Sequence, residues 1–193
     1  MLSQVVDKLN RAQVFTVPFD HIIIKNFLPD YMFQKLERVV NETHSGVKEG
    51  ANVDNQIIIN TRDSVEYPSF WEDWYSVFEN DEVKNIILEK FNVDSNFDFM
   101  RCDIHKCSSG FVLGCHNDVK SSSNEIVSLQ IYITENDDEN GVSLWNGRDG
   151  KIIKHIENKP NTAWLFKAHS DSWHSVQKCT RDRQSVLMKY MVK

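Results

Sequence analysis

The sequence has few of the features that bind zinc, form disulfide frameworks or cross membranes. Its four cysteines, Cys102, Cys107, Cys115 and Cys179, show no paired C-x-x-C spacing, which argues against a zinc knuckle or a disulfide framework. No stretch approaches the roughly 20 apolar residues that span a bilayer. The N-terminus lacks the basic region, apolar run and cleavage site of a secretory signal. We therefore expect a cytoplasmic protein with buried, reduced thiols and no membrane partner.

Basic residues are in deficit, because 22 Lys and Arg face 28 Asp and Glu and give a net charge of -6. Binding to a phosphate backbone needs clustered Lys and Arg, so the balance argues against nucleic acid as the main partner. The chain also has only four prolines and seven glycines, and we find neither a linker nor an internal repeat. Its 193 residues therefore predict one domain, 1–193, with one core.

The hydrophobic period changes along the chain. Up to about residue 92 helical patterns prevail, over 2–10, 29–44 and 68–91, with strand-like exceptions at 21–27 and 55–60. The stretch 68–91 fits either one helix or two. The third helical stretch carries a group of aromatic residues at helical spacing, which favours core packing over a surface that stacks a substrate: Phe70, Trp71, Trp74, Tyr75 and Phe78.

From about residue 96 to 193, short apolar stretches alternate with turn residues. Seven or eight short strands at this spacing predict a sandwich or barrel, with the helices of the first half packed on its outside. The predicted strands are 97–106, 111–118, 125–134, 142–147, 151–157, 162–168, 173–178 and 183–192. The predicted fold class is therefore mainly β with flanking helices (α+β).

The segment GCHNDVK places His116 and Asp118 two positions apart at the end of a predicted strand. Side chains alternate along a strand, so these two share a face and offer mixed N and O ligands to a divalent ion. Taken alone, the pair also fits a surface histidine beside a solvated aspartate. A third ligand could come from His174, in the strand-like segment WHSV, whereas His169 lies in the preceding loop.

Arg183 opens the last predicted strand, nine residues after His174. A buried arginine costs several kcal/mol in desolvation unless an anion pairs with it, and its planar fork matches a carboxylate. Ser185 shares its strand face and could donate a second hydrogen bond to that carboxylate. The pattern indicates a metal next to an anion pocket.

This spacing of His116, Asp118, His174 and Arg183 resembles that of the Fe(II)- and 2-oxoglutarate-dependent oxygenases, most closely the prolyl-hydroxylase-like branch. The similarity extends over about residues 18–192. It implies a double-stranded β-helix, or jelly roll, in which the two histidines and the aspartate bind Fe(II). It also implies that Arg183 binds the far carboxylate of 2-oxoglutarate.

The resemblance further implies a dioxygenase that uses 2-oxoglutarate and O2, releases succinate and CO2, and is supported by ascorbate. The expected reaction is hydroxylation of a peptidyl residue of the prolyl type or of a small metabolite. Some members contact the cosubstrate through a tyrosine on the strand before H-x-D, where this chain has His105 and Lys106. Tyr132 could replace it if the strand register turns it inward.

Two other classes of function remain open at the level of the residues. A jelly roll can be a non-catalytic, cupin-like module that binds a metal or a sugar. Two histidines and a carboxylate can also hold zinc and activate water for hydrolysis. Neither needs a buried guanidinium beside the metal, so Arg183 favours the oxygenase.

Overall fold

A computed structural model describes residues 1–44, 55–62, 66–94, 97–119, 125–134 and 141–192. It contains four described helices: α1 (Leu2–Arg11), α2 (Asp30–Glu42), α3 (Pro68–Phe78) and α4 (Asp81–Lys90). The predicted helical stretch 68–91 is thus two helices. They divide at Asn80, whose side chain accepts a hydrogen bond from the Glu82 amide and so caps the start of α4.

The strands of the described residues agree with the predicted segments, except for the two-residue β1, which the sequence did not predict. They are β1 (Val14–Phe15), β2 (His21–Ile24), β3 (Gln56–Asn60), β4 (Phe99–Cys107), β5 (Leu113–His116), β6 (Glu125–Tyr132), β7 (Val142–Trp145), β8 (Ile152–Ile156), β9 (Ala163–Lys167), β10 (His174–Val176) and β11 (Arg183–Met191).

Two antiparallel sheets face each other. The larger sheet has the order β1-β2-β9-β6-β11-β4-β3, and the smaller sheet has the order β5-β10-β7-β8. Strands distant in the sequence are neighbours, since β11 lies between β4 and β6. This is the double-stranded β-helix that was expected, and the predicted fold class is confirmed.

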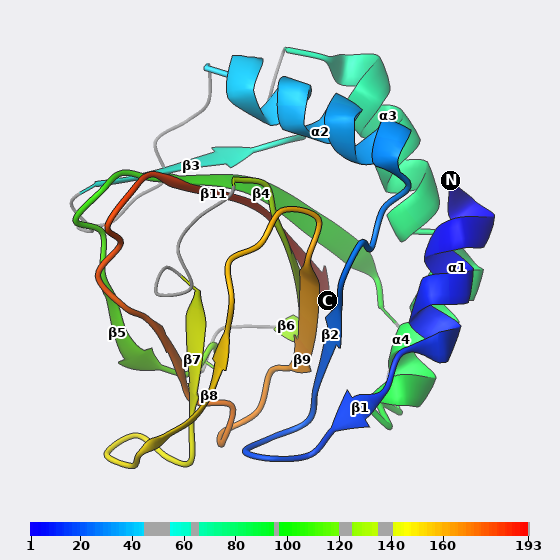
Figure 1. Ribbon diagram of the computed structural model, residues 1–193. Coiled ribbons are helices and arrows are strands. Elements are labelled where there is room, and N and C mark those ends of the chain that lie inside the picture. The colour runs from blue at the N-terminus through cyan, green and yellow to red at the C-terminus, as the bar shows by residue number, and fades with distance from the viewer. Residues whose placement is uncertain (45–54, 63–65, 95–96, 120–124, 135–140, 193) are drawn as a thin grey trace.

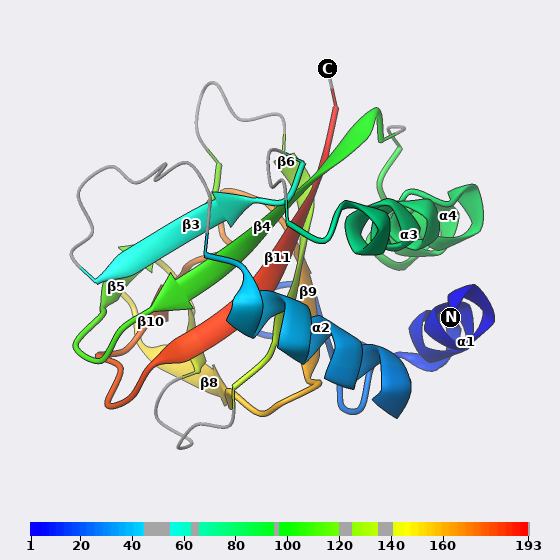
Figure 2. The same cartoon turned by 90° about the horizontal axis from the view of Figure 1, so that it is seen from above.

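The helices cover the outer face of the larger sheet (Figures 1 and 2). Alternation along each strand explains this arrangement: on β11, Val186, Met188 and Tyr190 join the core beneath the helices, while Arg183 and Leu187 point to the space between the sheets. The aromatic group of α3 is buried in the same core, which confirms its predicted packing role.

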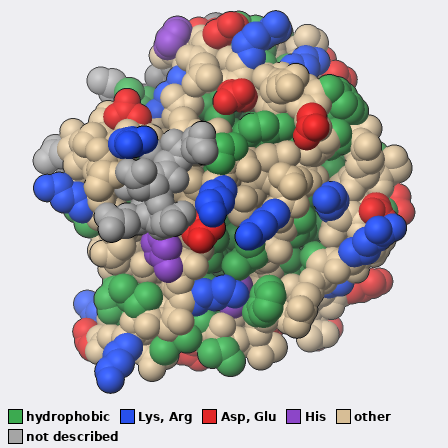
Figure 3. All heavy atoms as spheres, viewed as in Figure 1, with side chains coloured by type: hydrophobic (Ala, Val, Ile, Leu, Met, Phe, Trp, Pro, Cys, Tyr) green, Lys and Arg blue, Asp and Glu red, His purple; other side chains and the backbone are tan. Residues whose placement is uncertain are grey.

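The four cysteines are unpaired, as expected, and three of them are buried. Within the described residues, none of the helices has the length and apolarity needed to cross a membrane. Charged side chains of both signs are interspersed with hydrophobic ones on the face shown in Figure 3. The single domain over 1–193 and the cytoplasmic location stay predictions.

Candidate metal centre

The smaller sheet places two histidines opposite each other. His116 ends β5, His174 begins β10, and the antiparallel pairing of these strands makes them register partners. Their ring centroids lie 4.3 Å apart. The return of the chain thus brings His174 beside His116, as the barrel prediction required.

Asp118 completes the cluster, although from a bend and not from a strand. β5 ends at His116, so the predicted strand through residue 118 was two residues too long. Asn117 holds the bend, since its Nδ2 donates to the Ser170 carbonyl over 2.9 Å. The Asp118 carboxylate oxygens lie 3.6 Å from His116 Nε2 and 3.7 Å from His174 Nε2. One ligand atom from each of the three residues lies within 4.8 Å of the others.

The backbone fixes how the imidazoles face this cluster. Nδ1 of His116 donates to the Gly114 carbonyl over 2.8 Å, and Nδ1 of His174 donates to the Ser172 carbonyl over 2.9 Å. A proton on Nδ1 leaves the Nε2 lone pair free for a metal. Burial lowers the pKa of His174 to about 4, against the opposing effect of Asp118, so the imidazole is neutral near pH 7. This donor set suits a divalent ion with mixed N and O ligands.

The cluster lies in the wall of a cavity of about 440 Å³ between the two sheets. Its walls combine apolar side chains from both sheets with a few polar ones. Besides the three cluster residues, the lining comprises Gln56, Ile58, His105, Phe111, Leu113, Asn117, Ser128, Gln130, Val142, Trp164, Phe166, Val176, Arg183, Leu187 and Lys189.

Arg183 lines the same cavity with hydrogen-bond donors that lack acceptors. The residue is only 2% exposed, and neither its Nε nor its Nη2 has a partner. Its Cζ lies 5.2 Å from the ring centre of Tyr132, whose buried hydroxyl is also unpaired. Burial raises the pKa of Tyr132, so the phenol keeps its proton and can donate. Unpaired donors on and beside a buried cation favour the binding of an anion, because the anion would accept their hydrogen bonds and balance the charge.

Ser185 and Tyr132 are register partners on neighbouring strands, and both lie on the inner side of the larger sheet. Tyr132 therefore has the inward register that its predicted role requires. Ser185 is fully buried, two residues from Arg183, and its Oγ accepts a hydrogen bond from Gln130 Nε2 over 2.8 Å.

The structure separates the two neighbours His105 and Lys106. Lys106 points to the helix side, where its Nζ donates to the Thr43 carbonyl over 2.8 Å. His105 lines the cavity. Burial, with help from the charges of Arg183 and Lys189, lowers the pKa of His105 to about 3 and leaves it neutral. Of these two alternatives, only His105 is placed to meet a cavity ligand.

Several cavity residues were not singled out from the sequence. Gln130 and Trp164 carry no motif. Gln130 could have been found by counting alternate residues back from Tyr132 on β6, whereas Trp164 lies on β9 and is placed beside Gln130 by strand pairing. Gln56 and Ile58 could not have been found by such counting, because β3 reaches the cavity only by pairing with β4, far along the chain.

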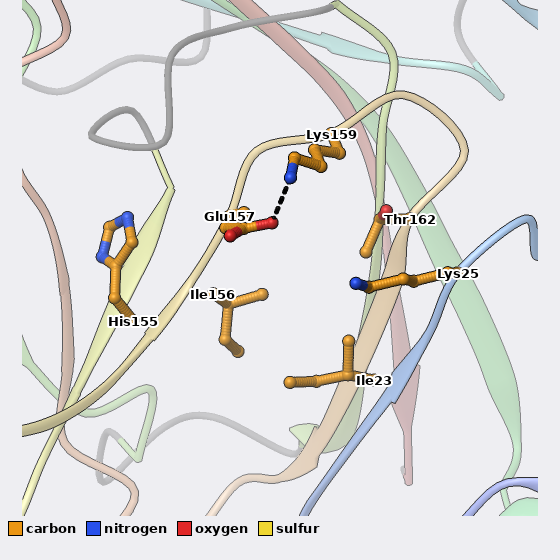
Figure 4. A pocket seen from close by; sticks show the side chains of 7 residues that line it. All are labelled: Ile23, Lys25, His155, Ile156, Glu157, Lys159 and Thr162. Carbon is orange, nitrogen blue, oxygen red and sulfur yellow. Dashed lines mark ion pairs between the residues drawn. The ribbon is translucent and has the colours of Figure 1, made fainter.

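A second, smaller hollow of about 180 Å³ lies between β2 and the end of β8 (Figure 4). Glu157 and Lys159 form an ion pair across its rim, and Lys25 also reaches it. It contains none of the predicted site residues, and its charged side chains are largely solvated.

The comparisons with known proteins agree with this geometry. The family model of the 2OG-Fe(II) oxygenase superfamily matches residues 102–192, which include all three cluster residues and Arg183. Residues 102–192 belong to the 2OG-Fe(II) oxygenase superfamily. A search of curated proteins finds no sequence that matches this chain.

Solved structures share the fold of this chain. A prolyl-4-hydroxylase from Pseudomonas putida aligns with a TM-score of 0.69 and 16% identity over 100% of both chains. A prolyl hydroxylase from Trichoplax adhaerens, in complex with a hypoxia inducible factor peptide fragment, aligns with a TM-score of 0.65 and 16% identity. The alignment covers 98% of this chain and 88% of that one. A prolyl 4-hydroxylase from Phytophthora capsici aligns with a TM-score of 0.72 and 11% identity. The alignment covers 99% of this chain and 65% of that one.

The superfamily comprises dioxygenases that use Fe(II) and 2-oxoglutarate, and the residues present fit both groups. The two Nε2 lone pairs and the Asp118 carboxylate converge as a metal requires. The unpaired nitrogens of Arg183 face the cavity, where a carboxylate would satisfy them. The family match therefore favours a dioxygenase over a non-catalytic cupin-like module and over a zinc hydrolase.

Proposed function

We propose that this oxygenase hydroxylates a peptidyl residue of the prolyl type, and that His116, Asp118 and His174 hold its Fe(II). The observation that carries the proposal is the joint placement of the cluster and the unpaired guanidinium of Arg183 in one cavity. When bound, the iron and 2-oxoglutarate supply the oxidising chemistry, with release of succinate and CO2.

The protein's own residues supply position and charge. Arg183, Ser185 and Tyr132 would donate hydrogen bonds to the tail carboxylate of bound 2-oxoglutarate, and Arg183 would balance its charge. Trp164 and Phe166 lie edge-on to the His174 ring, with centroids 5.8 and 5.0 Å away, and restrict water beside the metal ligand. Three of the similar solved structures are prolyl hydroxylases, which supports the prolyl type of substrate.

A first experiment tests the oxygenase assignment without a substrate. Fe(II) and 2-oxoglutarate added anaerobically should give a weak visible charge-transfer band, and oxygen should then give slow uncoupled succinate formation. Absence of both the band and the succinate would reject the proposal.

A second experiment tests the substrate. Prolyl peptides should increase the rate of succinate formation and gain one oxygen atom at proline, detected by mass spectrometry. Uncoupled turnover that no prolyl peptide stimulates would reject the prolyl assignment while leaving the oxygenase assignment intact.

One observation favours a second candidate, a small anionic metabolite. The charged side chains that line the cavity, among described residues, are Asp118, Arg183 and Lys189. Two of these three side chains are cationic, which favours an anionic ligand in the cavity. Lys189 lies six residues from Arg183 along β11, about 20 Å at the usual rise of a strand, and so at the other end of the cavity wall.

This second candidate has its own discriminating measurement. Small carboxylic acids and free amino acids should increase succinate formation, and Lys189→Met should raise the KM for the active compound. An unchanged KM in Lys189→Met, or stimulation by peptides alone, would count against the small metabolite.

A further inference from the structure

Three buried side chains form a hydrogen-bonded row across the larger sheet, from β9 through β6 to β11. Trp164 Nε1 donates to Gln130 Oε1 over 2.8 Å, and Gln130 Nε2 donates to Ser185 Oγ over 2.8 Å. Trp164 is 2% exposed, Gln130 is 6% exposed and Ser185 is fully buried. Bonds of this length between buried groups fix the orientation of each member.

The indole sets the direction of the whole row. An indole N–H can only donate, so the oxygen of the Gln130 amide must face Trp164 and the NH2 must face Ser185. Ser185 Oγ is then an acceptor from Gln130, and its own hydrogen points elsewhere. Gln130 is the only side-chain partner of Ser185 within the described parts of the chain.

The surroundings of Ser185 indicate what its hydrogen meets. Ser185 lies between Arg183 and Leu187 on the strand face that lines the cavity, and its register partner on β6 is Tyr132. Arg183 Nε, Arg183 Nη2 and the Tyr132 hydroxyl are donors without acceptors. With the Ser185 hydrogen, four donors gather on and beside Arg183, which lines the cavity, and such a set suits a carboxylate and repels a cation.

We infer that Gln130 and Trp164 are positioning residues, which orient the Ser185 hydroxyl as a donor to the tail carboxylate of 2-oxoglutarate. The inference rests on the proposed function, because it assumes that the cosubstrate tail binds at Arg183. Neither residue needs to touch the cosubstrate carboxylate for this role. Their effect passes through the single hydroxyl of Ser185.

A double-mutant cycle tests this dependence, with the dissociation constant of 2-oxoglutarate as its readout. The constant is measured on the Fe(II)-loaded protein without oxygen, from the charge-transfer band. Ser185→Ala should raise it about tenfold, as expected for the loss of one hydrogen bond to a charged group. Gln130→Met, which keeps the volume but loses both hydrogen bonds, should raise it about three- to tenfold.

The double variant distinguishes positioning from packing. If Gln130 acts through Ser185, then Gln130→Met should have almost no further effect in the Ser185→Ala background. The inference would be overturned if the increases in the dissociation constant caused by the two single substitutions multiplied in the double variant. It would also be overturned if Gln130→Met had the same dissociation constant as the wild type. Gln177→Met, at an exposed glutamine of β10's C-terminal flank, is the matched control and should leave the constant unchanged.

Reversing the direction of the row gives a second test. In Gln130→Glu the carboxylate can only accept, so the Ser185 hydrogen turns toward it and is lost to the cosubstrate. The dissociation constant should rise more than in Gln130→Met, and an equal or smaller rise would contradict the assigned direction. Should Gln130→Met fail to fold, the cycle of Trp164→Phe with Ser185→Ala answers the same question.

Failure of this inference can be told apart from failure of the proposed function. If the wild-type protein shows no 2-oxoglutarate-dependent band, the proposed function is wrong and the inference is rejected with it. If the wild-type protein binds 2-oxoglutarate and the variants bind it equally well, only the inference is wrong.

Discussion

The two faces of the larger sheet use the same strands for opposite purposes. On β11, Val186 and Met188 are buried beneath the helices, whereas Arg183 on the other face is buried with unpaired donors. Burial of apolar groups stabilises the fold, and burial of a charge without a partner destabilises it until an anion binds. One residue of register therefore separates the stabilising face from the ligand-binding face.

The largest expected effect is on the inner side, at the metal. His174→Ala removes one of three ligand atoms and should abolish stoichiometric Fe(II) binding, because the remaining two ligands no longer enclose the ion. Metal analysis after gel filtration measures this loss. His169→Ala, at an exposed histidine five residues away, should keep full iron content. Full iron content in His174→Ala would refute the ligand assignment.

A substitution on the outer face of the larger sheet should lower the stability of the fold and leave 2-oxoglutarate binding unchanged. Met188 is fully buried, so Met188→Ala should lower the free energy of unfolding by about 2–5 kcal/mol. The dissociation constant of 2-oxoglutarate should stay the same in the folded variant. Leu187→Ala, one residue along and on the inner face, should cost less stability, since Leu187 is only partly buried. Urea unfolding measures the free energy of unfolding of both variants. Equal losses of stability in the two variants would contradict the different roles assigned to the two faces of the sheet.

Arg183 should show opposite effects on stability and on binding. Arg183→Met replaces an unpaired buried charge by an apolar side chain, so the protein without ligands should be as stable or more stable by about 1–4 kcal/mol. The dissociation constant of 2-oxoglutarate should rise about 30-fold or more, from the roughly 2–5 kcal/mol of a buried charge pair. Thermal unfolding and titration of the charge-transfer band measure these. A destabilised Arg183→Met with normal affinity would point to a structural arginine.

The smallest expected effect concerns pH. Burial lowers the pKa of His105 to about 3 in the folded protein, whereas a histidine in the unfolded chain has a pKa near 6.5. Between these values unfolding takes up a proton, so the free energy of unfolding should fall as the pH is lowered, by up to about 1.4 kcal/mol per pH unit. His105→Gln should reduce this slope in urea unfolding at pH 7 and pH 5. A slope identical to that of the wild type would show that His105 is not buried as a neutral group.

The sequence was sufficient for most elements because their periodicity is local. Alternation along 183–192 and the helical stripe over 29–44 predicted both the strand and the helix. The metal cluster followed from a motif whose two histidines lie on strands, with Asp118 two residues past the end of β5. The division of 68–91 was left open, since the cap at Asn80 is a local hydrogen bond with no periodic signature.

The rest of the cavity depends on pairing between distant strands. β3 contributes Gln56 and Ile58 only because it lies beside β4, and the row from Trp164 to Ser185 crosses three strands. Hydrophobic pattern does not specify which strands become neighbours. The direction of the Trp164–Gln130–Ser185 row needs atomic positions as well, because sequence alone does not orient an amide.

The bend at Asp118 has a mechanical consequence. The two imidazoles stand on paired strands, whereas the carboxylate stands just past the last ladder pair and is held through the Asn117–Ser170 contact. A bend yields more readily than a ladder. With an ion bound, the oxygen donor would therefore be the ligand that adjusts to the radius of the ion, while the two nitrogen donors would keep the positions that the paired strands give them.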